Sequence, residues 1–204
     1  VNDGSTTQIN TLGTTSGLLD ITNNLTVNEK LKPHSDTADA FIRFTSAGKT
    51  LTVGSDVKTT ALAELYSIFF DFSGSMNIPE LTAARLQGET NSNATMLATG
   101  DLTVTQELEV NATTTFNANT NTINVKNTDV NGGTLDLRNS TLNFYTGASD
   151  TWTMSSSSTL TTGNTTVTGD STKTPTNIPE SAGGGFEIVG DVSNLDVTGD
   201  LTVI

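Results

Sequence analysis

Along the middle of the chain, apolar residues recur in pairs whose two members are separated by one residue. In two of these pairs the first member is Thr. This alternation places both members of a pair on one face of a β-strand. Polar runs rich in Asn and Gly lie between the pairs, and these residue types favour tight turns. The pairs are Leu102 and Val104, Leu108 and Val110, Thr114 and Phe116, Ile123 and Val125, Thr128 and Val130, Leu135 and Leu137, and Leu142 and Phe144. The pattern predicts short strands that each bury one face.

The spacing of these pairs distinguishes between two all-β folds. Most pairs begin six to nine residues apart, and in a β-solenoid three such strands make one coil of roughly 20 residues. The alternative, an antiparallel β-sandwich or jelly roll, usually has longer strands at a spacing of 8–12 residues. We therefore predict an all-β protein with a repetitive β-solenoid at residues 91–170.

Residues 1–90 are more aromatic and form a predicted β-rich N-terminal region with short helical segments. The helical segments are expected at residues 59–65 and 79–86, the second because Pro79 suits a helix start and Gly88 a helix stop. The strands are expected at residues 40–44, 50–53 and 68–70. The thickest core is expected around the aromatic residues Tyr66, Phe69, Phe70 and Phe72.

The C-terminal part of the chain divides into a loop and a set of strands. Residues 171–185 contain two prolines and a run of three glycines, which predicts a loop. Residues 186–204 return to an apolar alternation and end on an apolar segment. We predict that these last residues form terminal strands that contact another subunit.

An internal repeat links the two ends of the chain. The hexapeptide Thr-Gly-Asp-Leu-Thr-Val occupies residues 99–104 and 198–203, and a looser copy occupies residues 22–27. End strands with similar sequences suggest head-to-tail or strand-exchange polymerisation, in which the terminal strands of one subunit extend the sheet of the next. The residues predicted to make this contact are Leu19, Ile21, Leu25, Val27, Leu195, Val197, Leu201 and Val203.

Composition excludes several kinds of chemistry. The 204 residues include 41 Thr, 20 Asn, 18 Ser and 18 Gly but no Cys, which rules out disulfides, zinc–thiolate sites and thiol nucleophiles. The net charge of −13 argues against nucleic acid as a partner, because phosphate binding needs a basic surface. No apolar run reaches the roughly 18 residues of a membrane span. His34 lies in a polar stretch and is expected to be a solvated loop residue.

One short motif suggests a metal site. Asp71, Ser73 and Ser75 follow an apolar run and resemble the start of the metal-dependent adhesion site of the von Willebrand A domain. That resemblance implies Mg²⁺ bound by a carboxylate and hydroxyls in a fold of alternating strands and helices. The other interpretation is a strand that leaves the core into a polar Ser-Gly turn. We expect that the protein binds no cofactor. One alternative is Mg²⁺ at this motif, and the other is Ca²⁺ at four acidic residues that lie beside Gly. These four residues are Asp101, Asp170, Asp191 and Asp200.

The sequence does not favour phosphate binding or glycoside chemistry. Residues 46–50 are similar to the end of a phosphate-binding loop, but Arg43 stands where the upstream Gly is required. Outward acids such as Glu107, Glu109 and Asp136 are interpreted as ordinary charges on a solenoid wall, so no enzyme is predicted.

The sequence is compatible with glycan binding and with N-glycosylation. Tyr145 and Trp152 form either a patch for glycan stacking or the closure of one coil, and closure is favoured. The Asn-X-Ser/Thr pattern marks five possible N-glycosylation sites. They are Asn24, Asn93, Asn111, Asn139 and Asn164.

The pattern of short apolar alternations and turn residues in residues 95–204 resembles that of a broad group of surface proteins. The segments at residues 132–139 and 196–203 are similar to the passenger solenoids of bacterial surface adhesins, to fibres of tailed phages, and to archaeal or bacterial surface filaments. The resemblance implies an extracellular, cell-surface or virion-surface location and carries over no site residue. We expect a structural subunit of a self-assembling filament, sheath or fibre. The alternatives are a receptor- or glycan-binding adhesin or tail-fibre module, and a metal-dependent adhesion domain.

Overall fold

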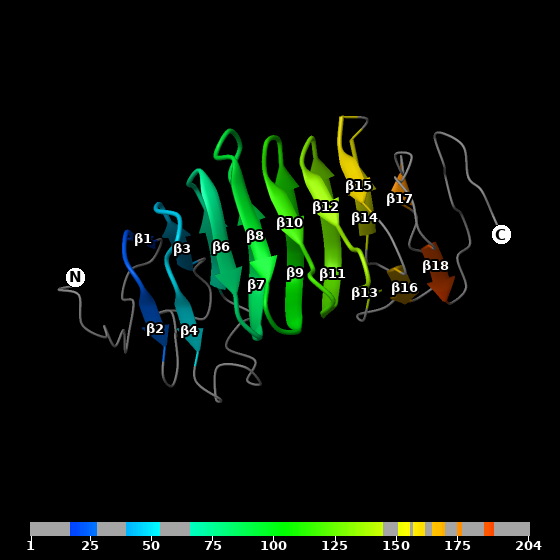
Figure 1. Cartoon of the computed structure of the whole chain (residues 1–204), viewed down its shortest axis with the longest axis horizontal. Helices are drawn as coiled ribbons and strands as arrows, with labels where there is room; N and C mark the ends of the chain where they lie inside the picture. The colour runs from blue at the N-terminus through cyan, green and yellow to red at the C-terminus, as the bar shows by residue number, and fades with distance from the viewer. Residues whose placement is uncertain are drawn as a thin grey trace.

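The chain folds into a parallel β-solenoid of about 5 turns. A computed structural model describes residues 17–27, 40–53, 66–144, 151–155, 157–161, 165–169, 175–176 and 186–189. Every regular element in these residues is a strand. Figure 1 shows the strands stacked side by side along the longest axis, from β1 near the N-terminus to β18 near the C-terminus.

Three sheets run along this stack, and every pair of strands within them is parallel. The larger sheet contains β1 (Gly17–Ile21), β3 (Ala40–Phe44), β5 (Tyr66–Phe70), β7 (Leu81–Gly88), β9 (Leu102–Asn111), β11 (Thr122–Asn131), β13 (Thr141–Phe144), β14 (Thr151–Met154), β16 (Thr165–Gly169), β17 (Pro175–Thr176) and β18 (Phe186–Val189). The second sheet contains β6 (Gly74–Ile78), β8 (Ala94–Ala98), β10 (Thr115–Asn117), β12 (Thr134–Asp136) and β15 (Thr159–Thr161). The third contains β2 (Leu25–Val27) and β4 (Leu51–Val53). Parallel pairing throughout excludes the antiparallel sandwich.

The alternating pairs of the sequence are the inward-facing positions of the coils. All the pairs that predicted strands are buried, including the two that begin with Thr, Thr114 and Thr128. Leu102 pairs with Ile123, which is 21 residues later and one coil along. Residues of the same type thus stack in columns inside the solenoid, and the predicted coil length is confirmed.

The inner column that contains Leu108 and Trp152 has a polar residue, Thr128, between them. Neither the hydroxyl of Thr128 nor the indole nitrogen of Trp152 has a hydrogen-bond partner. An unpaired buried polar group costs about 1–3 kcal/mol. This part of the core is therefore less stabilising than the aliphatic column around it.

The aromatic residues of the N-terminal half form a stack inside the first coils. The rings of Phe44 and Phe70 lie 6.1 Å apart and nearly parallel, and Phe72 meets Phe70 edge to face at 6.3 Å. All three side chains are buried. The prediction of an aromatic core in this half is confirmed for Phe70 and Phe72, whereas Phe69 is only partly buried and the side chain of Tyr66 lies outside the described part.

The helical segment predicted at residues 79–86 is wrong. These residues lead into and form most of β7, in which Leu81, Ala83 and Leu86 are buried. A register shift between Ala83 and Arg85 bends the strand and keeps Leu86 facing inward. The combination of Pro79 and Gly88 marks strand ends here, because pairing with β5 and β9 overrides the local helix signals. The other predicted helix, at residues 59–65, lies outside the described residues.

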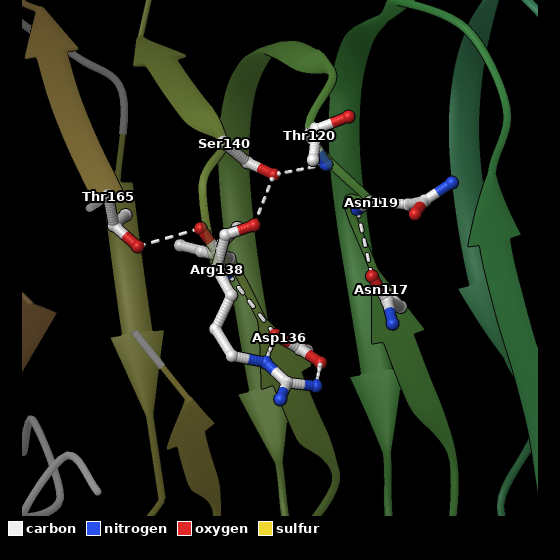
Figure 2. A network of polar contacts seen from close by, with 8 residues as sticks. Asn117, Asn119, Thr120, Asp136, Arg138, Ser140 and Thr165 are labelled. Carbon is white, nitrogen blue, oxygen red and sulfur yellow. Dashed lines mark hydrogen bonds and ion pairs between the residues drawn. The ribbon is translucent and has the colours of Figure 1, made fainter. Parts of the chain in front are cut away.

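The corners between strands are held by side chains that bond to the backbone of neighbouring coils. Figure 2 shows Ser140 in the corner between β12 and β13, where its hydroxyl accepts a hydrogen bond from the backbone N–H of Thr120 at 3.0 Å and donates to the carbonyl of Arg138 at 3.2 Å. Thr165 of the next coil donates from its hydroxyl to the carbonyl of Leu137 at 2.7 Å. Hydroxyl groups therefore provide hydrogen-bond partners for backbone N–H and C=O groups at the corners, where strand pairing provides none.

Several corners require left-handed backbone. Thr120 and Asn139 both precede, by two residues, the paired positions Thr122 and Thr141, so they occupy equivalent corners of adjacent coils. Their φ angles are 68° and 55°. Asn tolerates this conformation, whereas a β-branched residue is strained in it.

Replacing Thr120 with Asn is expected to raise the free energy of unfolding by about 1 kcal/mol, because the strain is relieved without loss of a contact. The Thr120 side chain is exposed, and its backbone N–H still donates to Ser140. Urea unfolding measures the change, with Thr122→Asn in the following strand as the control. Equal shifts in both variants would contradict the explanation from backbone strain.

Candidate functional site

The two end strands of the larger sheet are the first candidate site, since the sequence predicted subunit contact at the ends. Within the described part of the chain, β1 pairs with β3 alone and β18 pairs with β16 alone. Leu18 in β1 is 49% exposed and is the one large exposed hydrophobic residue among the described residues. Each end strand therefore offers an edge with no described strand against it.

Four of the residues predicted for assembly lie in the first coil. Leu25 is buried, and Ile21 is partly buried and packs against the core. Leu19 lies in β1 and Val27 in β2. Leu25 and Ile21 thus stabilise the coil from inside. The other four, Leu195, Val197, Leu201 and Val203, lie outside the described residues.

The copy of the hexapeptide at residues 99–104 and the looser copy at residues 22–27 occupy different corners of the coil, and the copy at residues 198–203 lies outside the described residues. Residues 99–101 lead from the second sheet into the larger sheet, where Leu102 and Val104 are buried. Residues 22–24 lead instead from the larger sheet into β2, where Leu25 is buried. The two copies share corner chemistry and not a position in the coil. Similar sequences in these two segments therefore do not mean equivalent places in a coil.

Asp71 begins the corner between β5 and β6. The described residues contain no helix, so the fold implied by the resemblance to the von Willebrand A domain is wrong for this chain. A carboxylate oxygen of Asp71 lies 3.6 Å from the guanidinium of Arg43, and this positive charge opposes binding of a cation. Ser73 and Ser75 are exposed. No three His, Cys, Asp or Glu residues of the described part are grouped so that they could hold a metal. The corner fits Mg²⁺ poorly.

The remaining metal and phosphate candidates have structural roles or lie outside the described residues. Asp101 accepts a hydrogen bond from the backbone N–H of Thr122 at 2.7 Å and so fixes the next coil. The backbone N–H of Gly48, in the segment similar to a phosphate-binding loop, donates to the carbonyl of Ser75 at 3.1 Å. The residues outside are His34, Asp170, Asp191 and Asp200.

Five carboxylates follow one another across the larger sheet and its corners, and we call them the acid ladder. Glu109 and Asp129 are direct partners on β9 and β11. Asp71 and Glu89 follow the paired residues at the ends of β5 and β7, so they occupy equivalent corner positions. The ladder consists of Asp71, Glu89, Glu107, Glu109 and Asp129. The strand spacing places the two members of each of these pairs about 4.8 Å apart, and Glu107 lies two residues before Glu109 on the same strand.

Burial and neighbouring charges act together on two members of the acid ladder. Burial raises the pKa of Glu89, Asp71 and Glu109 raise it further, and Arg43 lowers it. Burial also raises the pKa of Glu107. Arg85, 3.3 Å away, opposes this rise, and Glu109 and Asp129 add to it. Both glutamates therefore hold a proton more readily than a free glutamate does.

The opposite effect occurs at the end of the same sheet. The hydrogen bonds from Arg43 lower the pKa of Asp20, with a distance of 2.8 Å from Nε to Oδ1. Arg43 thus lies between Asp20 on one side and Asp71 on the other. Arg43 and Arg85 are the bases that face the acid ladder in the described ion pairs.

The second sheet carries a column of hydroxyl groups on its outer face. Its members are registered partners on successive strands, which places them about 4.8 Å apart. They are Ser75, Thr95, Thr115, Thr134 and Thr159. This column has no charge, and it gives the wall regular hydrogen-bonding groups that suit close packing against another surface.

Asp136, considered for catalysis, and Trp152, considered for sugar binding, both make contacts within the coils. Asp136 is buried and accepts bonds from Arg138, at 2.9 Å from Nε and 2.6 Å from the terminal nitrogen (Figure 2). Trp152 is 1% exposed and packs against Phe144 with ring centroids 6.0 Å apart. The indole therefore closes a coil, as favoured from the sequence, and is not available for stacking on a glycan. Tyr145 lies outside the described residues.

The possible glycosylation sites differ in exposure. Asn24, Asn93 and Asn139 are exposed at corners. Asn111 is 6% exposed, and its amide nitrogen donates to Glu109 at 2.8 Å. A glycan on Asn111 would disrupt this packing, so the three exposed sites are the better acceptors. Asn164 lies outside the described residues.

No family model, curated protein or solved structure matches the chain. In the described ranges, no helix is long and apolar enough to cross a membrane.

Sequence reasoning missed the acid ladder and the hydroxyl column. The signal for both is spacing at the coil period. Glu109 lies 20 residues before Asp129, and Thr95 lies 20 residues before Thr115. These intervals bring distant residues side by side only in a solenoid.

Proposed function

We propose that this chain is a structural subunit of an extracellular filament, sheath or fibre, and that copies join by adding end strands to one another's sheets. The observation that carries the proposal is the continuous parallel sheet, whose end strands β1 and β18 each have one described strand partner. A strand edge with open N–H and C=O groups is a ready template for another strand.

The character of the walls supports this proposal. The outer hydroxyl column carries no charge, and only 15% of the residues of the whole chain are charged. Two solenoids that met along this column would bring no like charges together there, although the whole chain carries a net charge of −13. The extracellular location is supported by the abundance of Thr and Asn and by the resemblance to surface solenoids.

Leu18→Lys tests the contact at the β1 end. The exposed Leu18 is expected to be covered in the assembly, and covering a Leu contributes about 1.5–3 kcal/mol. The variant should therefore need about tenfold more protein to assemble than the wild type does. Sedimentation velocity measures the assembled fraction, and negative-stain microscopy shows whether the particles are filaments.

Gln106→Lys is the matched control, because it adds the same charge at an exposed position of β9, far from both ends of the sheet. Truncation after Gly190 leaves β18 in place and removes the other predicted assembly residues, Leu195, Val197, Leu201 and Val203. A wild-type chain that stays monomeric at all concentrations would refute the proposal. Equal assembly by the wild type and the truncated chain would refute the role of the terminal strands.

A further inference from the structure

The acid ladder brings together carboxylates that the established geometry of the coils cannot separate. Parallel register fixes Glu109 beside Asp129, and the corner bonds fix Glu89 beside Asp71. The backbone N–H of Glu89 donates to the carbonyl of Phe70 at 3.0 Å. Because the backbone holds each position, repulsion between the side chains cannot be relieved by moving one strand away from the next.

Glu109 occupies the centre of this arrangement. It acts on Glu89, at the corner after the preceding strand β7, and on Glu107, two residues earlier on its own strand β9. Both of these carboxyls are also partly withdrawn from water. Its own carboxylate accepts a hydrogen bond from Asn111 at 2.8 Å. Neutralising Glu109 would therefore reduce repulsion in two neighbouring coils.

We propose that the acid ladder is a pH-sensitive device that makes the coil stack more stable in mildly acidic than in neutral solution. The groups that face Glu89 are Asp71, Glu109 and Arg43, and those that face Glu107 are Arg85, Glu109 and Asp129. Burial is the largest influence on both glutamates and favours the protonated form, and in each set two acids add to it against one base. This inference concerns the stability of a single chain and does not depend on whether chains assemble.

The direction follows from proton linkage. A glutamate whose pKa is raised in the folded state stabilises the fold below its unfolded value, near 4.5. That contribution is lost as the pH rises through the raised folded value. Asp20 has the opposite shift, and its contribution is complete above 3.8 and lost only below that pH. Between about pH 4.5 and 7.5 the raised glutamates therefore set the slope.

Urea unfolding at pH 4.5 and at pH 7.5 tests the device. The wild type is expected to unfold at a lower urea concentration at pH 7.5. Each unit by which the folded pKa exceeds the unfolded pKa corresponds to about a tenfold rise in the unfolding constant. Glu109→Gln should recover much of the loss at pH 7.5, because the amide oxygen still accepts from Asn111 but carries no charge.

Glu80→Gln is the matched control, since it removes one negative charge from an exposed corner outside the acid ladder. It should keep the pH slope of the wild type. A wild-type midpoint that is equal at the two pH values, or higher at pH 7.5, would overturn the proposal. So would a control that recovers as much stability as Glu109→Gln does.

Discussion

Gly133→Ala is expected to lower the free energy of unfolding by about 3 kcal/mol, at the upper end of the usual cost of overpacking. A Cβ at this position would lie 2.5 Å from the carbonyl oxygen of Asn111 and 2.6 Å from that of Val110, both in the preceding coil. These are backbone atoms held by the sheet, so neither can move away without breaking the register between coils. Thermal or urea unfolding measures the loss.

Gly48→Ala separates this close approach from the general effect of removing a glycine. Nothing lies within 4 Å of a Cβ built at Gly48, although its φ of +67° makes any other residue strained. The expected cost is about 1 kcal/mol. If the two substitutions cost the same, contact between coils is not what requires Gly133.

Phe116→Ala is expected to cost about 4 kcal/mol, as is typical for removing a fully buried phenyl ring. Phe116 is the inward residue of the three-residue strand β10 and lies between Met96 and Leu135 in the stacked column. The coils above and below cannot close the cavity, because strand spacing holds them apart. The unfolding midpoint measures this loss.

Phe116→Leu and Thr115→Ala are the controls. Leucine keeps most of the volume and should cost about 1.5 kcal/mol or less. Thr115 is the outward neighbour of Phe116, and its truncation should change the free energy by about 0.5 kcal/mol or less. A large loss for Thr115→Ala would contradict the assignment of the inner and outer faces.

Sequence periodicity predicted the solenoid because the fold is built from local rules repeated at each coil. The buried pairs from Leu102 to Phe144 needed only alternation and turn residues. Left-handed corners at Asn119 and Asn139 follow from the same turn chemistry. Trp152 was also assigned correctly to coil closure, since an isolated aromatic residue suits the core of a coil better than an exposed patch.

What the sequence did not reveal depends on contacts between coils. The strand β7 carries helix-start and helix-stop signals, and only pairing on both sides makes it extended. The sequence around Asp71 resembles a metal-binding loop, but Arg43 of the preceding coil lies beside Asp71 and opposes the binding of a cation. Likewise, the two copies of the repeat look equivalent until their corners are compared. For β7 and for Asp71 the deciding neighbour is about one coil away along the chain.

The stacking of coils also determines how the molecule would respond to force. Leu102 and Ile123 are 21 residues apart but lie on adjacent strands, so one coil advances the stack by only about 4.8 Å. Fully extended, the same residues span about 70 Å. Tension along the stack would therefore peel off one coil at a time, each releasing many times its own height in chain length. Such a body absorbs mechanical work in successive small steps while the remaining coils stay folded.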